Sequence, residues 1–382
     1  MPQSNLNRQE RLAAFRARHS SPLHENQSPT GTEIADLTVH PLRERISGRQ
    51  YTVFRLMTKS GLSGYGECAN ISDGDLVEAK RTVLGMSCAA FEVARHKLQS
   101  LPGVQAAVNM ALLDILGKVV HAPAYQILGG PTRFKARVMA RLQGESEDKL
   151  LASLGWVRQG GFRAFVIPLP RRMEVGSIRD LIHSMRRLLE KLQAVGGERT
   201  DFVLGGTGDL SFDETLALAR GVEGLGLLWL DEPCDATQFR AGHGTTVMPV
   251  GFGKGLHRCS DFLTLLRDEA ADVIRPDFGL NGIVQIRRIA ALAETYYIAA
   301  APHHHGGPIS TAAALHLAAS LPNFFIQEIP YPDDEADIKM RAELVGTSVE
   351  TVEDGFARIP AGEGLGITVN EAALEKYWES SA

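Results

Sequence analysis

The amino-terminal part of the chain alternates apolar and polar residues with the period of two that half-buried strands show. IADLTVHPLRE at 34–44 and YTVFRLMTKSG at 51–61 have this alternation, and the glycine-bearing GLSGYGE follows at 61–67. The pattern predicts an antiparallel meander within 33–70. Residues 75–129 then change to a helical period, and VQAAVNMALLDILGKVV places its apolar residues on one broad face.

After residue 135, short apolar runs recur with helix-length amphipathic segments between most of them. Eight strands that alternate with helices over about 200 residues are typical of a closed parallel barrel. A doubly wound open sheet is the alternative, but neither of its usual phosphate-binding motifs, GxGxxG after a strand or GxxxxGK[ST], occurs in the sequence. The runs that predict the barrel strands are 138–142, 162–169, 201–206, 227–233, 246–253, 271–277, 296–303 and 323–328.

These patterns divide the chain into a tail, a cap and a barrel. Residues 1–32 are rich in Gln, Asn, Ser, Arg and His and predict a disordered tail. An α+β accessory domain is expected at 33–132, and the segment 350–382 is expected to complete it. The barrel is expected at 133–349. The predicted fold class is therefore α/β, a TIM-type barrel with an α+β accessory domain, called the cap below.

Composition narrows the class of protein. Lys and Arg total 40 and Asp and Glu total 45 in 382 residues, so the formal net charge of −5 argues against a dedicated nucleic-acid binder. The four cysteines show no CxxC spacing, which favours free thiols in a reducing compartment. No apolar run approaches the roughly 18 residues of a membrane span. We therefore expect a soluble, cytoplasmic enzyme that binds neither nucleic acid nor membranes.

Polar residues at the ends of the predicted barrel strands are the first candidates for chemistry, because catalytic side chains of such barrels gather there. Glu232 ends LLWLDEP, and a carboxylate at a buried strand end needs a cation or hydrogen-bond donors. Asp231 beside it is expected to point to the opposite side and to cap the loop. Lys254 lies between glycines in GFGKG, which allow close approach of a ligand. Glu328 ends the last strand and is a candidate hydrogen-bonding acid; a solvated charge is the alternative at each position.

Two further strand ends predict an acid–base pair. Asp277 ends ADVIRPD and His303 ends the next run, so the two side chains are expected to touch. An aspartate that accepts a hydrogen bond from one imidazole nitrogen fixes the tautomer and raises the basicity of the other nitrogen. His304 and His305 cannot share the direction of His303 and are expected to belong to the loop.

Several motifs, in order along 34–377, resemble the enolase superfamily, and most closely its mandelate racemase, muconate lactonizing enzyme and acid-sugar dehydratase branch. They are GLSGYGEC, AVNMALLDILGKVVHAPAYQILGG, WLDEP, VIRPDFGLNGI, APHHHGGPI and IPAGEGLGI. The resemblance implies a modified (β/α)7β barrel under an α+β cap, and commonly a homo-oligomer. It also implies Mg²⁺ held by three carboxylates on successive strand ends, where the metal stabilises the enediolate that forms when a base removes the proton α to a carboxylate.

Transferred position by position, the family's site is only partly present. The second metal carboxylate corresponds to Glu232, the dyad to Asp277 and His303, and the last-strand glutamate to Glu328. The first metal carboxylate falls on Gly205 and the third on Lys254, and the family's K-x-K lysines fall on Val166 and Pro168. At about 4 Å and an effective dielectric constant near 20, a lysine repels each unit of metal charge by roughly 4 kcal/mol. We therefore predict no metal at the usual place, with Glu232 as a remnant ligand, and Mg²⁺ as the alternative cofactor.

Three functions follow from this pattern. The first is a lyase, isomerase or racemase that transfers the α-proton of a small carboxylate (a sugar acid, its lactone or a hydroxy acid) without metal. In this function Lys254 pairs with Glu232 when the site is empty and with the substrate carboxylate when substrate is bound. The second is a Mg²⁺-dependent acid-sugar dehydratase or racemase with a replacement ligand such as Asp209. The third is a non-catalytic metabolite-binding protein. The resemblance also implies that a cap loop contacts the substrate, which makes Arg43, Arg45 and Arg49 candidates for anion binding.

Overall fold

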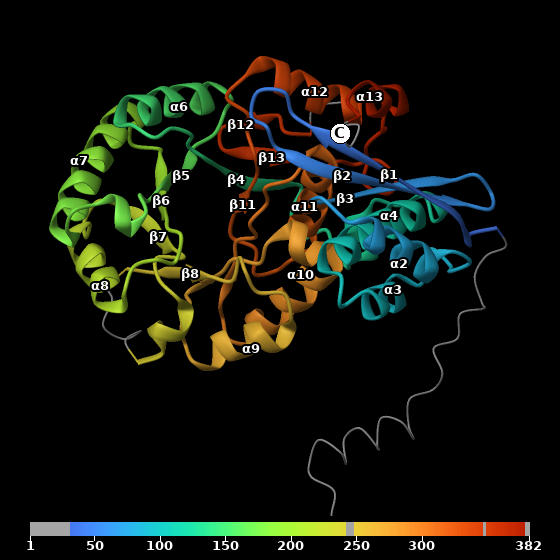
Figure 1. Ribbon diagram of the computed structural model, residues 1–382, viewed down its shortest axis with the longest axis horizontal. Coiled ribbons are helices and arrows are strands. Elements are labelled where there is room, and N and C mark those ends of the chain that lie inside the picture. Colours follow the sequence, from blue (N-terminus) through green and yellow to red (C-terminus); the bar gives the residue numbers. More distant parts are fainter. Residues whose placement is uncertain (1–30, 242–247, 347–348, 379–382) are drawn as a thin grey trace, which may run out of the picture.

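The computed structural model describes residues 31–241, 248–346 and 349–378. The expected tail at 1–32 therefore lies almost wholly outside the described residues. Within these residues a cap and a barrel lie side by side, with the cap strands crossing beside a ring of barrel strands (Figure 1). No helix in this part of the chain has the length and apolar character that crossing a membrane requires.

The cap begins with the predicted meander. Strands β1, β2 and β3 form an antiparallel sheet in that order, and helices α2, α3, α4 and α5 follow. Helix α4 packs on β3 so closely that a Cβ atom at Gly64 would lie 2.3 Å from the carbonyl oxygen of Ala111, and one at Gly66 would lie 1.9 Å from that of Ala107. The glycines of GLSGYGE therefore allow helix and strand to touch. The bounds are β1 Ile34–Arg43, β2 Gln50–Thr58, β3 Ser63–Cys68, α2 Asp73–Val83, α3 Phe91–Lys97, α4 Pro102–Val119 and α5 Ala124–Ile127.

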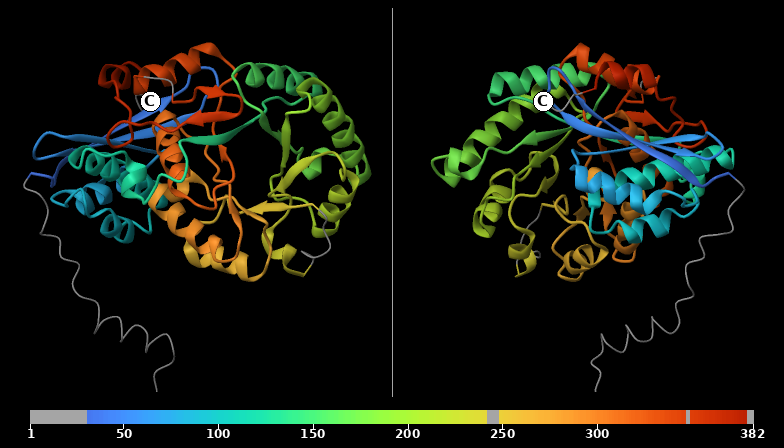
Figure 2. Two further views of the ribbon diagram at one scale, coloured as in Figure 1. Left: turned by 180° about the vertical axis from the view of Figure 1, so that it is seen from behind. Right: turned by 45° about the vertical axis from the view of Figure 1, so that its right-hand side comes forward.

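Eight parallel strands form the barrel, as the apolar runs predicted. Strands β4 to β10 pair in chain order, β11 pairs with β4, and a bridge between Ala300 and Phe324 joins β10 to the segment before β11. Helices surround this ring on the outside, which Figure 2 shows from behind. The strands are β4 Lys135–Arg141, β5 Ala164–Pro168, β6 Asp201–Gly205, β7 Leu227–Asp231, β8 Val250–Phe252, β9 Val273–Ile274, β10 Ala299–Ala300 and β11 Gln327–Glu328.

The connections of the barrel are helical, and α4 of the cap packs against α10. The short element η2 stands between β7 and β8, where the other connections have α-helices. The helices are α6 Glu147–Gln159, α7 Ile178–Gly196, α8 Phe212–Gly221, η2 Ala236–Ala241, α9 Cys259–Arg267, α10 Phe278–Glu294, α11 Pro308–Ser320 and α12 Glu335–Val345, with η1 Arg172–Glu174 before α7.

The carboxyl-terminal segment is divided between the two parts. Strands β12 (Val352–Glu353) and β13 (Phe356–Arg358) form a hairpin that pairs antiparallel with barrel strand β4. Helix α13 (Glu371–Lys376) instead contacts β1, and Glu371 binds cap residues on β2 and β3. The expectation that 350–382 completes the cap stays a prediction. In the structure α13 contacts a cap strand, whereas the hairpin pairs with a barrel strand.

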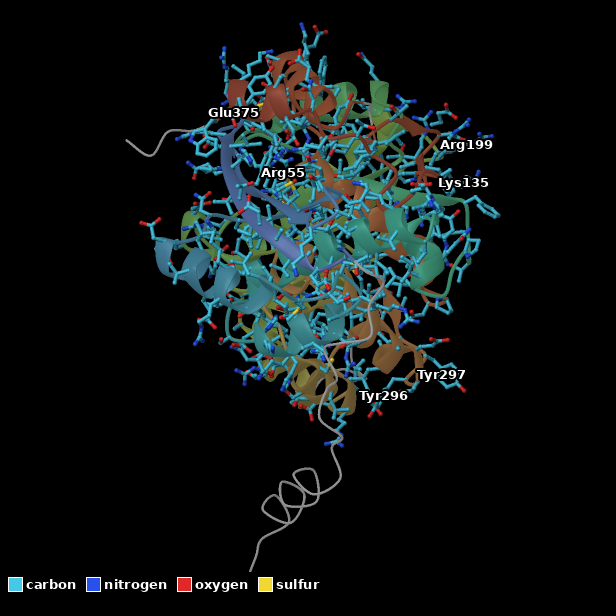
Figure 3. The ribbon with its side chains drawn as sticks, turned by 90° about the vertical axis from the view of Figure 1, so that its right-hand side faces the viewer. Arg55, Lys135, Arg199, Tyr296, Tyr297 and Glu375 are labelled. Atoms are coloured by element: carbon cyan, nitrogen blue, oxygen red, sulfur yellow. The ribbon has the colours of Figure 1, made fainter. Side chains whose placement is uncertain are left out.

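One layer of apolar side chains fills the inside of the barrel. Its members are Met139, Ala164, Val166, Val203, Trp229, Val273, Ala301 and Ile326. Side chains in a strand alternate between faces, so the residues two positions later point to the same interior, one layer nearer the carboxyl ends. The opposite face of the molecule carries the beginnings of the strands, and Figure 3 shows Lys135 and Arg199 together along that edge.

Candidate active site

A cavity of about 1280 Å³ lies between the cap and the carboxyl ends of the barrel strands. The cap contributes the loop around Arg49 and Gln50, with Asn70 after β3. The barrel contributes Arg141 and Lys254, together with other side chains beyond the interior layer. The position agrees with the usual place of active sites in parallel barrels.

The predicted dyad forms at this end of the barrel. His303 Nδ1 lies 2.6 Å from Asp277 Oδ2, and Asp277 Oδ1 accepts a hydrogen bond from the backbone N–H of Leu280 at 2.8 Å. Because an ionised carboxylate only accepts hydrogen bonds, Nδ1 of His303 carries the proton and Nε2 is left to accept one. Asp277 is held in place as the N-cap of α10, so the orientation of the imidazole ring follows from the start of a helix.

The carboxylate that faces the barrel interior on β7 is Asp231, two residues after interior Trp229. Its oxygens lie 2.9 and 3.3 Å from nitrogens of Arg275 and 2.5 Å from Nζ of Lys254. Although burial favours the neutral form, the charges of Arg275 and Lys254 lower the pKa of Asp231 to about 2. The prediction that Asp231 points away and caps the loop is wrong.

Glu232 has a different position from the one predicted. Its backbone takes φ 50°, so the alternation of β7 ends one residue earlier. Its Oε1 accepts hydrogen bonds from the backbone N–H groups of Gly253 at 2.7 Å and Lys254 at 2.8 Å. Glu232 therefore holds the loop after β8, and the ammonium of Lys254 pairs with Asp231, not with Glu232 as expected.

Arg275 and Glu328 continue the charged layer inside the barrel. The Arg275 side chain is fully buried, and it donates to Asp231, to Glu328 and to the carbonyl oxygen of Ala301. Glu328 Oε1 lies 3.9 Å from His303 Nε2. Burial opposes ionisation of Glu328, but the neighbouring His303, Arg275 and Arg141 keep its pKa well below its usual value. Glu328 is thus an ionised group beside the free nitrogen of the dyad.

Arg141, which the sequence analysis did not single out, stands at the end of β4 and lines the cavity. A Cβ atom built on Gly205 would lie 2.8 Å from one terminal nitrogen of Arg141 and 3.1 Å from the other. The guanidinium therefore occupies the space in which a side chain at position 205 would begin. The signal that could have found Arg141, Asp231 and Arg275 is their position two residues after an interior apolar residue.

Comparisons with known proteins assign the chain to a family. A family model described as enolase C-terminal domain-like matches residues 150–373, more than half of the chain. The chain belongs to this family. The resemblance to the enolase superfamily and the expected fold are thereby confirmed.

Named relatives agree with this assignment. The D-galactonate dehydratase of Ralstonia pickettii is 28% identical over 288 residues, which cover 70% of this chain and 72% of that protein. The D-xylonate dehydratase of Haloferax volcanii is 27% identical over 286 residues, covering 71% and 68%. The mandelate racemase/muconate lactonizing enzyme structure from Sulfitobacter sp. is 25% identical with a TM-score of 0.81, covering 92% of this chain and 96% of that one. The chain belongs to the family and has dehydratases among its relatives, which confirms the expectation of an enzyme of the lyase or isomerase class.

The family generally uses Mg²⁺, and the residues present here do not fit such a site. Lys254 places its ammonium on Asp231, and the guanidinium of Arg141 fills the space beside Gly205. Among the residues that the structure describes, no three His, Cys, Asp or Glu side chains gather as a metal-binding group. The suggested replacement ligand, Asp209, is exposed and accepts a hydrogen bond from the backbone N–H of Arg172 at 2.7 Å.

The cap arginines and the loop histidines are distributed unevenly around the cavity. Arg49 lines it, but its NH1 also pairs with buried Glu44 at 3.1 Å. Arg43 and Arg45 are exposed and do not line it. Of the loop histidines, His304 is buried, whereas His305 lines the cavity with its ring stacked 5.8 Å from that of His303.

Proposed function

We propose that this chain is an acid-sugar lyase that removes the proton α to a carboxylate and eliminates water without a divalent metal. The observation that carries the proposal is the contact of Lys254 with Asp231, beside the His303–Asp277 pair. Fixed cations stand where the family holds a metal, and a group that transfers protons lies next to them.

The proton transfer begins at Nε2 of His303. This nitrogen takes the α-proton, and the electron pair of the broken C–H bond moves into the carboxylate to give an enediolate. Asp277 stabilises the imidazolium that forms, because its carboxylate holds the proton on Nδ1. Lys254 supplies positive charge near the enediolate oxygens, as an electrostatic group fixed before the reaction.

Elimination then needs a proton for the leaving group. The imidazolium of His303 returns its proton to the β-hydroxyl, the C–O bond breaks, and water leaves. The electron pair of the enediolate forms the double bond between the α and β carbons. The resulting enol becomes a 2-oxo acid by ordinary tautomerisation, so the whole sequence converts a 2,3-dihydroxy acid into a 2-oxo-3-deoxy acid and water.

The walls of the cavity support a sugar acid as the substrate. Gln50 and Asn70 from the cap, and Gln143, Ser310 and Asp333 from the barrel, line it with hydrogen-bonding groups. These groups suit a chain of hydroxyls, and the relatives named as D-galactonate and D-xylonate dehydratases agree. The homo-oligomer and the cytoplasmic location remain predictions.

The test is a turnover screen of aldonates in the presence of EDTA, with the 2-oxo acid product measured. We expect turnover that His303→Asn abolishes. Turnover that stops in EDTA and returns with Mg²⁺ would instead favour the metal-dependent dehydratase. Melting-temperature shifts with an aldonate, without turnover under either condition, would favour a binding protein without catalysis.

A further inference from the structure

We propose that Arg141 binds the substrate carboxylate, with its guanidinium in the space that a side chain at position 205 would fill. This inference rests on the proposed function, because it names the group that replaces a metal in holding the acid. Arg141 comes from β4, the first strand of the barrel, and the sequence motifs of the resemblance do not include it.

Arg141 has free hydrogen-bonding capacity at the cavity. Arg141 Nε lies 3.6 Å from Glu328 Oε1. Among the residues at 31–241, 248–346 and 349–378, neither terminal nitrogen of Arg141 has a protein acceptor. Arg275, in contrast, is fully buried and uses its nitrogens on Asp231, Glu328 and a carbonyl oxygen. The Arg141 side chain is 23% exposed and borders the cavity.

Gly205 leaves room for the Arg141 guanidinium. A methyl group there would meet the terminal nitrogens of Arg141 at 2.8 and 3.1 Å and Val166 Cγ1 at 2.7 Å. Gly205 pairs in register with Asp231, whose carboxylate holds Lys254. The guanidinium of Arg141 thus keeps its position beside Gly205 only while residue 205 has no side chain.

The charges at the barrel mouth form one network of ion pairs. In this network Arg141, Lys254 and Arg275 are positive and Asp231, Asp277 and Glu328 are negative, so its formal sum is zero with neutral His303. Glu232 lies outside the network, because its Oε1 accepts hydrogen bonds from two backbone N–H groups. Without Arg141 the sum of this network would be minus one, which favours an anion less. With it, a planar carboxylate meets a planar fork of N–H donors, which matches its two oxygens better than an ammonium does.

The experiment compares a carboxylate with its neutral isostere. Calorimetry measures the binding of oxalate, D-galactonate and D-galactonamide to the wild type, Arg141→Gln and Arg141→Lys. We expect Arg141→Gln to weaken binding of the two acids roughly 10- to 100-fold, as for loss of hydrogen bonds to a charged group, and to leave D-galactonamide unchanged. Arg141→Lys keeps the charge and loses the fork, so its loss for the acids should be intermediate.

Gly205→Ala tests whether the Arg141 guanidinium needs the space beside Gly205. It should weaken binding of the acids as Arg141→Gln does, and the double variant should lose little more than either single variant, because both changes remove the same contact. Gly155→Ala is the matched control, since a Cβ atom there meets nothing within 4 Å and the residue lies in α6, away from the cavity.

Each outcome decides one question. Acid binding that is unchanged in both Arg141 variants, or acid binding absent from the wild type, overturns the inference. A preference for acid over amide that disappears in Arg141→Gln supports it. Arg141-dependent binding of D-galactonate without turnover of any aldonate supports the inference and contradicts the proposed function.

Discussion

Magnesium is expected neither to bind the wild-type protein at the barrel mouth nor to change its turnover. The perturbation that tests this is a charge reversal. Lys254→Glu combined with Gly205→Asp supplies two carboxylates beside Asp231, and Arg141→Ala removes the guanidinium that occupies the space at position 205. The triple variant should bind Mg²⁺ where the wild type does not.

The magnitude follows from one distance. Lys254 Nζ lies 2.5 Å from Asp231 Oδ2, so a Mg²⁺ ion at about 2.1 Å from the same oxygen would lie roughly 4 Å, and at most about 4.6 Å, from the ammonium. Two unit charges at about 4 Å repel by about 4 kcal/mol at an effective dielectric constant of 20, and a dication by about 8 kcal/mol. This corresponds to roughly six powers of ten in affinity.

Calorimetric titration with MgCl₂ measures the binding directly. We expect no saturable heat for the wild type and a saturable curve for the triple variant. Lys254→Met is the matched control, because it removes the repulsion without adding a ligand and should bind Mg²⁺ less tightly than the triple variant. Saturable Mg²⁺ binding by the wild type, or turnover that EDTA stops and Mg²⁺ restores, would refute the reasoning.

Three other changes test the dyad, the cap and the buried charges. Asp277→Asn should slow exchange of the substrate α-proton with deuterated solvent roughly 100-fold or more, because His303 loses the acceptor that orients it. Burial raises the pKa of Glu67 to about 7 from 4.5, so the stability tied to its proton is present below about pH 4.5 and is lost by about pH 7. Glu67→Gln should remove this loss of about 3 kcal/mol, measured by urea unfolding at pH 4 and pH 8. Arg341→Met should lower the free energy of unfolding by about 3–5 kcal/mol, because it leaves the buried Glu44 carboxylate without the Arg341 guanidinium.

Controls distinguish these effects from general damage. Arg81→Met removes an exposed ion pair with Glu78 and should leave the midpoint of urea unfolding almost unchanged. Proton exchange at the wild-type rate in Asp277→Asn would contradict the role of the dyad. An unchanged pH dependence in Glu67→Gln would show that other groups cause it, and a loss in Arg341→Met as small as that of Arg81→Met would contradict the buried network.

The sequence allowed the barrel, the cap meander and the His303–Asp277 pair to be predicted, because each depends on periodicity or on the order of strands. It did not allow the inward carboxylate of β7 to be chosen correctly. Asp231 and Glu232 are adjacent, and a shift of one residue reverses which side chain enters the barrel. The decision needs the interior layer, since Trp229 fixes the face of Asp231, and the φ of 50° at Glu232 is not evident from the sequence.

The three unusual positions at the barrel mouth depend on one another. Lys254→Glu alone would change the formal charge of the cluster from zero to minus two while the space at Gly205 still holds the Arg141 guanidinium, so neither a metal set nor an anion site would be complete. Gly205→Asp alone would displace that guanidinium and leave Lys254 repelling any metal. Glycine at 205, arginine at 141 and lysine at 254 therefore form one consistent arrangement, in which fixed cations hold a carboxylate beside His303.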